Sequence, residues 1–505
     1  MSVEFRYIEH PDIAPLAWGM VVKIGQPVID VHVGSMVETT PDFFVSGVWD
    51  GAFADGGFDK AELFCGGGVK RHGDAVTAYT STHERQRLCY AKKEDAVYVS
   101  NSVPFVLALT GDTLDVQCDQ YEAIFCSIVD GLEEYQKEVP LANGASMYQI
   151  FSSDITIDGD GCVTVTRKPL HRDFENFDDY YQSIVNVTRA IRENGEDAAR
   201  KYPFEMMTTT SSGYDSSACA AIAYAAGCRL ACTLKDGKYD EDSGVGVAKQ
   251  LGYDTVVEAG CYDYRERPDD LDATFFADGD LGFFMPFDGF RDAFKQKIVV
   301  TGISGGYMWD TDSKVNPDSK RTGYPFYLTN ISFCEHSLQY GYVMLPLVLY
   351  ASTAAESVVA ISNTAEMEPW TMHTNYDRPI PRRILETAGV KRGTFATANR
   401  GGGVSFSRNF RKAQIQKKMT YTGYESFVRW LSEKGRNRWT PKRVWHAVRY
   451  HWSTIPEYMD FVLLKLGQAP RFGGKRENHV PNPGLPAKMV IWGIETEIKR
   501  YKAML

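Results

Sequence analysis

Residues 206–228 read MMTTTSSGYDSSACAAIAYAAGC, and this stretch predicts how the second half of the chain begins to fold. The apolar, Thr-rich run Met206–Thr210 is typical of a buried strand, and the Ala-rich run Ser217–Ala226 is typical of a helix. Small, hydroxyl-bearing residues and one glycine lie between them. Such a turn aims backbone N–H groups and the positive end of a helix at one point, which predicts an anion site.

The sequence on the C-terminal side of this stretch continues the same alternation. We expect a strand at Arg229–Leu234, a helix over EDSGVGVAKQLG (241–252), a strand at DTVVEA (254–259) and another within KQKIVVTGISGG (295–306). Strands alternating with helices through short connections predict a parallel sheet, with ligands bound at the carboxyl ends of its strands. Beyond residue 340 we expect mostly helix.

The N-terminal third has a different pattern. Up to about residue 168, short runs rich in Val, Thr and Tyr, such as PVIDVHVG (27–34) and GCVTVTRKPL (161–170), are separated by turns containing Gly and Asp. These runs predict an antiparallel sandwich or another layered β domain. Apolar residues then recur at helical spacing, at Ile184, Val187 and Ile191. We therefore expect a β-rich domain over 1–170 and an α/β domain over 171–505.

Composition excludes several classes of protein. The chain has 505 residues and a net charge of −10, which disfavours a general nucleic-acid or membrane-surface binder. None of its ten cysteines forms a CxxC pair, so a zinc ribbon or dithiol site is not expected, and buried reduced thiols are. The sequence contains no apolar run long enough for a membrane span, and it does not start like a signal peptide. These features predict a cytoplasmic protein.

The loop SSGYDSS (211–217) resembles the SGGxDSS pyrophosphate loop of ATP-pyrophosphatase enzymes. Its context resembles the asparagine synthetase family, which includes β-lactam synthetase, carbapenam synthetase and the lasso-peptide cyclases. The resemblance covers the whole chain and implies an Ntn-glutaminase-like layered β domain before a PP-loop ATP-pyrophosphatase domain with a helical C-terminal part. In this family a substrate carboxylate attacks the α-phosphorus of ATP, and an amine or ammonia captures the acyl-adenylate.

The resemblance assigns ATP binding to the loop and to Leu234, near the adenine. The loop residues concerned are Ser211, Ser212, Gly213, Asp215, Ser216 and Ser217. An acid in a phosphate loop would repel a bare phosphate, so Asp215 indicates a bridging Mg²⁺. A cluster of N-cap residues at the start of a helix is the structural alternative.

A second landmark of the family is a Gly-rich turn of the form SGxGGDELF. The matching stretch is TGISGGYMWD (301–310), with Gly302 as a nucleotide-binding residue. Gly306 occupies the place of the usual metal-binding Asp and Tyr307 that of the Glu. We treat Tyr307 as a catalytic candidate and Asp310, or Asp312, as a displaced metal ligand. A turn kept for its backbone geometry is the alternative.

A dense basic stretch follows in this acidic chain: Arg378, Arg382, Arg383, Lys391, Arg392 and Arg400. Fixed positive charge suits a polyphosphate leaving group. Arg378 is therefore expected to bind the nucleotide. Arg400, closest to the lysine loop of the family, is a catalytic candidate. Ion pairs to Asp377 and Glu386 are the structural alternative. Glu335 or His336 is a candidate general base for the amine.

The glutaminase motifs of the family are absent, because Ser2 follows Met1 where relatives carry Cys and no Asn-Gly-Glu stretch is found between residues 60 and 110. The resemblance therefore implies an ATP-dependent, AMP-forming amide ligase or cyclase that does not hydrolyse glutamine. Its expected partners are a small-molecule or peptide carboxylate and an amine, without nucleic acid or membrane, and the sequence leaves a homodimer open. A catalytically degenerate nucleotide- or partner-binding scaffold is the main alternative. A tRNA-modifying PP-loop enzyme is disfavoured by the acidic charge.

Overall fold

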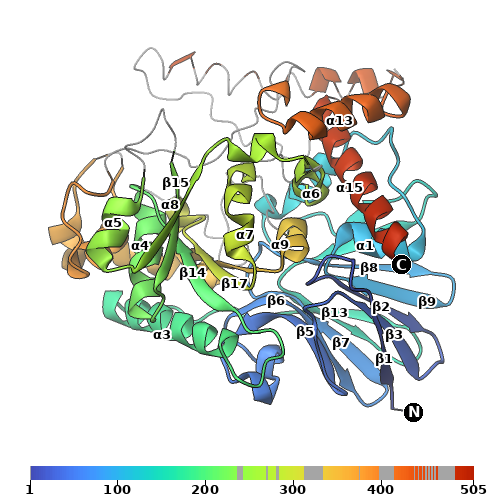
Figure 1. Ribbon diagram of the computed structural model, residues 1–505, viewed down its shortest axis with the longest axis horizontal. Coiled ribbons are helices and arrows are strands. Elements are labelled where there is room, and N and C mark those ends of the chain that lie inside the picture. The colour runs from blue at the N-terminus through green and yellow to red at the C-terminus, as the bar shows by residue number, and fades with distance from the viewer. Residues whose placement is uncertain are drawn as a thin grey trace.

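The computed structural model describes residues 2–235, 243–268, 271–279, 284–311, 334–374, 376–396, 415–436 and 484–505, with further residues between 438 and 463. It confirms a β-rich N-terminal region and a parallel sheet with helices in the second half of the chain (Figure 1).

Two sheets make up the N-terminal region. The seven-stranded sheet runs β1 (Glu4–Glu9), β3 (Val28–Val33), β2 (Trp18–Lys23), β9 (Ala96–Ser100), β8 (Leu88–Lys93), β11 (Ser146–Ile150) and β10 (Glu138–Pro140). The six-stranded sheet runs β13 (Val163–Arg167), β12 (Ser153–Ile157), β7 (Ala75–Tyr79), β6 (Phe64–His72), β5 (Phe43–Trp49) and β4 (Glu38–Thr39). All pairs are antiparallel except β1 with β3.

The two sheets share a dry core. Trp18 and Val99 from the first sheet and Phe44 and Ile155 from the second are fully buried in one apolar cluster. Alternate side chains of β2, β3, β9, β7 and β12 enter this space, which is the packing that a sandwich requires. The layered antiparallel prediction is therefore confirmed.

Two helices after β9 were not anticipated from the sequence. α1 (Val103–Thr110) and α2 (Tyr121–Cys126) interrupt the β-rich region. Ser102 caps α1 by accepting a hydrogen bond from the N–H of Phe105 at 3.1 Å. α1 is buried on nearly all sides, so its sequence VPFVLALT lacks the polar face by which a helix is recognised.

The second half of the chain forms a five-stranded sheet in the order β16 (Thr255–Gly260), β15 (Leu230–Lys235), β14 (Glu205–Thr209), β17 (Lys297–Thr301) and β18 (Val343–Pro346). All four strand pairs are parallel, as predicted. β18 is a strand that the sequence did not predict in the mostly helical part beyond residue 340. Its four residues are all buried and too few to show a strand pattern.

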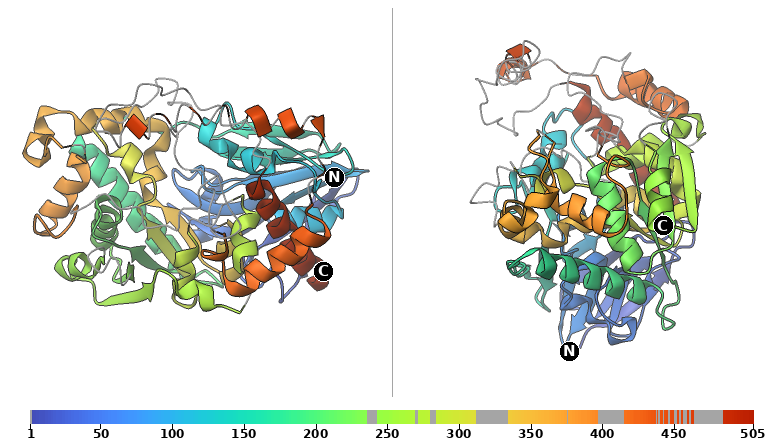
Figure 2. Two further views of the ribbon diagram at one scale, coloured as in Figure 1. Left: turned by 90° about the horizontal axis from the view of Figure 1, so that it is seen from above. Right: turned by 90° about the vertical axis from the view of Figure 1, so that its left-hand side faces the viewer.

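Helices cover this sheet and link it to the sandwich. Their bounds are α3 (Phe177–Gly195), α4 (Tyr214–Ala225), α5 (Val245–Leu251), α6 (Leu271–Ala277), α7 (Arg291–Phe294), α8 (Gly305–Met308), α9 (Cys334–Tyr340), α10 (Ala355–Ser362), α11 (Pro379–Thr387), α13 (Tyr421–Glu433) and α15 (Leu485–Met504). The C-terminal helix α15 returns to pack on α1 and α6 (Figure 2). Among the described residues no helix is both long and apolar enough to cross a bilayer.

Candidate functional site

The loops that follow β14 and β17 meet at the centre of the parallel sheet. From β14 the chain proceeds outward to β15 and β16, whereas β17 and β18 lie on the other side, so the strand order reverses between β14 and β17. Ligands of open parallel sheets bind outside the carboxyl ends of the strands at such a point. The two motifs singled out in the sequence, SSGYDSS and TGISGGYMWD, are the loops at this point. We call the place where they meet the switch-point crevice.

Glycines allow these two loops to approach closely. A methyl group on Gly302 would lie 2.4 Å from the carbonyl carbon of Asp215, and one on Gly305 would lie 2.3 Å from its carboxyl carbon. Neither position has room for a side chain. The backbone of the second motif therefore rests directly on the first turn of α4.

Serine side chains hold the β14–α4 loop by bonding to the loop itself. Ser211 Oγ lies 2.6 Å from Ser216 Oγ and accepts a hydrogen bond from the N–H of Gly213 at 3.0 Å. Ser217 Oγ donates to the carbonyl of Ser211 at 2.5 Å. The N-cap residue of α4 is Gly213, which has no side chain with which to cap the first turn. The serines thus shape the loop, and the simple N-cap explanation does not account for them.

Two buried hydroxyls at this edge have no hydrogen-bond partner among the described residues. They are Oγ1 of Thr210, directly after β14, and Oγ1 of Thr301, the last residue of β17. Each residue is 3% exposed. Buried hydroxyls are normally paired, so these two, at neighbouring strand ends, are available to a polar ligand or to water.

Arg378 occupies the place where a cation was expected. Its Nη1 lies 2.5 and 2.6 Å from the two carboxylate oxygens of Asp215, and its Nε lies 4.0 Å from Asp310. Burial raises the pKa of the Asp215 carboxyl, and Arg378 opposes that effect. The guanidinium also lies over the ring of Tyr376, 4.9 Å from its centroid.

This arrangement does not fit a Mg²⁺ ion bound by Asp215 and Asp310. Both oxygens of Asp215 are engaged by the guanidinium, and the described residues contain no cluster of three potential metal-ligating side chains. A divalent cation beside Arg378 would meet a like charge. We therefore assign no protein-bound metal to the crevice.

An aromatic cluster fixes the first turn of α4 on its other side. Tyr214 is 1% exposed, lies against the rings of Tyr376 and Phe395, and accepts a hydrogen bond from Arg382. The N–H of Ala396 donates to the carbonyl of Ser212 at 2.6 Å. Segments 376–382 and 395–396 therefore wrap the loop.

Other predicted site residues lie at the same edge. Leu234 is half-buried near the carboxyl end of β15, and Gly302 directly follows β17. Gly306 lies close to Arg378, since a methyl group added to Gly306 would lie 2.7 Å from Arg378 Nη2. Tyr307 belongs to α8, but its side chain, like Asp312 and Arg400, lies outside what the structure describes.

Glu335 and His336 are not brought to the crevice by any described contact. Glu335 is 2% exposed in α9 and accepts a hydrogen bond from Tyr501 of α15 at 3.2 Å. His336 is fully buried, with its ring nitrogens 2.8 Å from Tyr342 Oη and 3.2 Å from Asp288 Oδ1. Both residues contact elements of the core, which favours a structural role for each.

Most of the basic stretch is neutralised by acids. Glu386 pairs with Arg382 and Arg392, as the ion-pair alternative anticipated, while Arg383 pairs with Glu366 and Asp178. Asp377 instead accepts the N–H groups of Met372 and His373. Arg378 is thus the member of this stretch that reaches the loop acid.

Sequence reasoning missed Arg85, which links the sandwich to the crevice. Its Nη2 donates to Ser304 Oγ at 3.0 Å across 219 residues. Ser304 has a φ of 80°, a left-handed conformation that costs a non-glycine residue free energy. Nothing in the sequence around Arg85 indicates this contact.

The comparisons with known proteins do not indicate a function. A scan against models of protein families finds no match, and a search of the curated proteins finds no similar sequence.

Proposed function

We propose that the switch-point crevice binds ATP and that the protein is an AMP-forming amide ligase or cyclase of the asparagine synthetase type. The buried hydroxyls of Thr210 and Thr301 carry this proposal, because they have no hydrogen-bond partner among the described residues and lie where the two glycine-containing loops leave their strands. Bound ATP would supply an activated phosphorus for a substrate carboxylate. The sandwich would be the Ntn-like partner domain, and the parallel sheet the PP-loop domain.

The residues of this chain that would hold the polyphosphate are those of the β14–α4 loop. The half-buried Gly213 leaves the start of α4 open, since only Ser211 Oγ lies near the position of an added methyl group, at 3.3 Å. Backbone N–H groups there and the helix dipole favour an anion. Position 306 is a glycine and has no acid with which to bind a metal ion. Arg378 would supply the positive charge that such a metal ion would otherwise provide.

ATP binding is tested by calorimetry on the full chain and on Gly213→Val. Position 213 has φ −77° and ψ 170°, which valine adopts readily, so the variant should fold while its side chain blocks the anion. We expect at least tenfold weaker ATP binding in the variant than in the wild type. Ser183→Ala, in α3, is the control. Equal ATP affinity in Gly213→Val and wild type would refute the site.

The Asp215–Arg378 pair favours a second function, a nucleotide-binding scaffold that performs no ligation. ATP–pyrophosphate exchange with a panel of carboxylates separates the two, with and without added Mg²⁺. Exchange that depends on a carboxylate supports the ligase. Saturable ATP binding without exchange for any carboxylate supports the scaffold.

A further inference from the structure

A separate cavity lies where the sandwich meets the second half of the chain. Its volume is about 160 Å³, and its walls come from residues 59–62, 82, 132, 152, 154, 167–171, 350, 352 and 353. None of these residues belongs to the switch-point crevice. A cavity of roughly this volume accommodates a molecule about the size of benzene.

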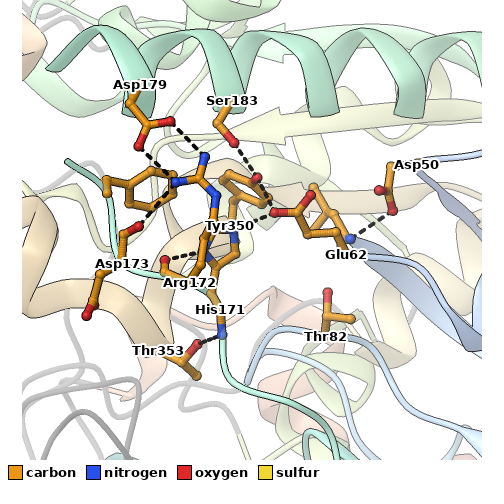
Figure 3. A network of polar contacts seen from close by, with 12 residues as sticks. Asp50, Glu62, Thr82, His171, Arg172, Asp173, Asp179, Ser183, Tyr350 and Thr353 are labelled. Atoms are coloured by element: carbon orange, nitrogen blue, oxygen red, sulfur yellow. Dashed lines mark hydrogen bonds and ion pairs between the residues drawn. The ribbon is translucent and has the colours of Figure 1, made fainter. Parts of the chain in front are cut away.

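One wall of the cavity is a chain of polar contacts centred on Glu62 (Figure 3). Tyr350 Oη donates to Glu62 Oε1 at 2.7 Å and lies 2.8 Å from Ser183 Oγ. His171 Nε2 lies 2.7 Å from the same Glu62 oxygen, and His171 Nδ1 lies 2.7 Å from the carbonyl of Arg172. The contact with His171 holds the pKa of Glu62 below its usual value. The cavity therefore has an ionised carboxylate fixed in its wall.

Ser152 supplies an unpaired group to the lining of the same cavity. The residue is 5% exposed, and its Oγ has no hydrogen-bond partner in the described part of the chain. Its φ of 42° lies in the left-handed region, which disfavours a serine. A buried hydroxyl without a partner that lines a cavity is satisfied when a polar ligand occupies the cavity.

Charges of both signs line this small space. The acids are Asp59, Glu62 and Asp154, and the cationic side chains are those of Lys60, Arg167 and Lys168. Lys168 and Asp154 pair with each other at 2.6 Å, whereas Lys60 forms no ion pair within the described residues. A ligand with one sign of charge would meet like charges here. A ligand with both signs finds a partner for each.

We propose that this cavity binds a small zwitterion of the amino-acid class, with its ammonium group toward Glu62 and its carboxylate toward Lys60. The proposal does not depend on the function assigned to the crevice. Ser152 Oγ then completes the polar contacts of the ligand.

The probes are the twenty L-amino acids, titrated into the full chain by calorimetry. Each amino acid that binds is compared with its decarboxylated amine and its deaminated acid. We expect saturable binding of at least one amino acid and at least tenfold weaker binding of both single-charge analogues. Glu62→Gln should weaken the binding at least tenfold. Asp179→Asn, which breaks the neighbouring Arg172 ion pair outside the cavity, should not.

Ser152→Gly keeps the proposal testable if Glu62→Gln fails to fold. Glycine adopts a φ of 42° without steric strain, so the melting temperature of this variant should equal or exceed that of the wild type. The loss of Ser152 Oγ should weaken binding of the amino acid. The proposal is overturned if no amino acid binds at millimolar concentration or if single-charge analogues bind as tightly. It is equally overturned if Glu62→Gln and Ser152→Gly both fold and bind like the wild type.

Discussion

At the scale of one residue, the close contact of the two crevice loops depends on glycine, which has no side chain, at position 302. In Gly302→Ala the added methyl group would meet the backbone of Asp215 and Ser216 at 2.4 Å, so the two loops must separate. We expect the free energy of unfolding to fall by about 1–3 kcal/mol and ATP binding to weaken. Denaturant titration and calorimetry measure the two effects.

Gly246→Ala is the matched control. Gly246 lies in α5, and its added methyl group would meet only Thr394 Cγ2 at 3.6 Å. Alanine is favoured over glycine within helices, so this variant should be neutral or more stable by up to about 1 kcal/mol. Equal effects of the two substitutions would contradict the close contact at Gly302.

The Asp215–Arg378 pair makes a prediction about coupling. Arg378→Met leaves the carboxylate without its partner, whereas Asp215→Asn with Arg378→Met removes both charges together. We expect the stability losses of Asp215→Asn and Arg378→Met, added together, to exceed the loss of the double variant. The difference, which is the coupling energy, should be about 1–3 kcal/mol. A double-mutant cycle by thermal or denaturant unfolding measures it. Additive effects would show that the two side chains do not depend on each other.

The sequence predicted which residues form the loops, but not which residues far away in the chain contact them. SSGYDSS follows β14, so local pattern was enough to place it after that strand, although α4 begins at Tyr214 and not at the predicted Ser217. Asp215 and Arg378 are 163 residues apart, and Arg85 and Ser304 are 219 apart. No spacing rule relates such pairs. The Mg²⁺ prediction followed from Asp215 and Asp310, without the guanidinium of Arg378 that engages Asp215.

At the scale of elements, Glu335 makes the docking of α9 on α15 depend on pH. Burial raises the pKa of Glu335 from 4.5 to about 8, beside Tyr501 and Glu497 of α15, Asp278 and Arg87. The folded state therefore binds a proton that the unfolded state has released. The contribution of Glu335 to stability is fully present below about pH 4.5 and is lost as the pH rises to about 8. Each pKa unit corresponds to about 1.4 kcal/mol.

Glu335→Gln removes this titration while keeping the shape of the side chain. We expect the stability difference between wild type and variant to change by several kcal/mol, on the order of 3, between pH 5 and pH 8, with the variant favoured at high pH. Melting temperatures across this range measure it. Glu356→Gln, on α10, provides a carboxylate control. Parallel pH profiles of Glu335→Gln and wild type would show that Glu335 is not protonated in the folded state.

Elements with a local signature were predicted, and elements buried on all sides were not. β14, β15, β16 and β17 each follow a turn and a helix, and their predicted bounds lie within a few residues of the observed ones. α1 lies between a sheet and α15, so no polar stripe marks it as a helix. β18 has four residues, too few for any period to show.

At the scale of the whole molecule, the sequence pattern changes near residue 170, but the packing crosses that position. Tyr501 of α15 stacks on Phe105 of α1, with ring centroids 4.6 Å apart. Lys488, also in α15, donates to the carbonyl of Val116, and the buried pair Arg443–Asp119 adds a second link. A single apolar cluster contains residues of α1, α2, α6 and α15.

The two halves should therefore not fold independently. A chain ending at residue 170 would expose the apolar face of α1, and a chain starting at 171 would expose the face of α15 that covers it. We expect the full-length protein to unfold in one calorimetric transition, each half expressed alone to aggregate or remain unfolded, and co-expression of the halves to restore a soluble complex. Phe105→Ala, which removes the stacked ring, should lower the melting temperature of that single transition without splitting it, by a loss of about 3–5 kcal/mol. Two resolved transitions in the wild type, or a folded 171–505 fragment, would show that α15 is dispensable for the α/β half and that the boundary in the sequence is also a boundary in stability.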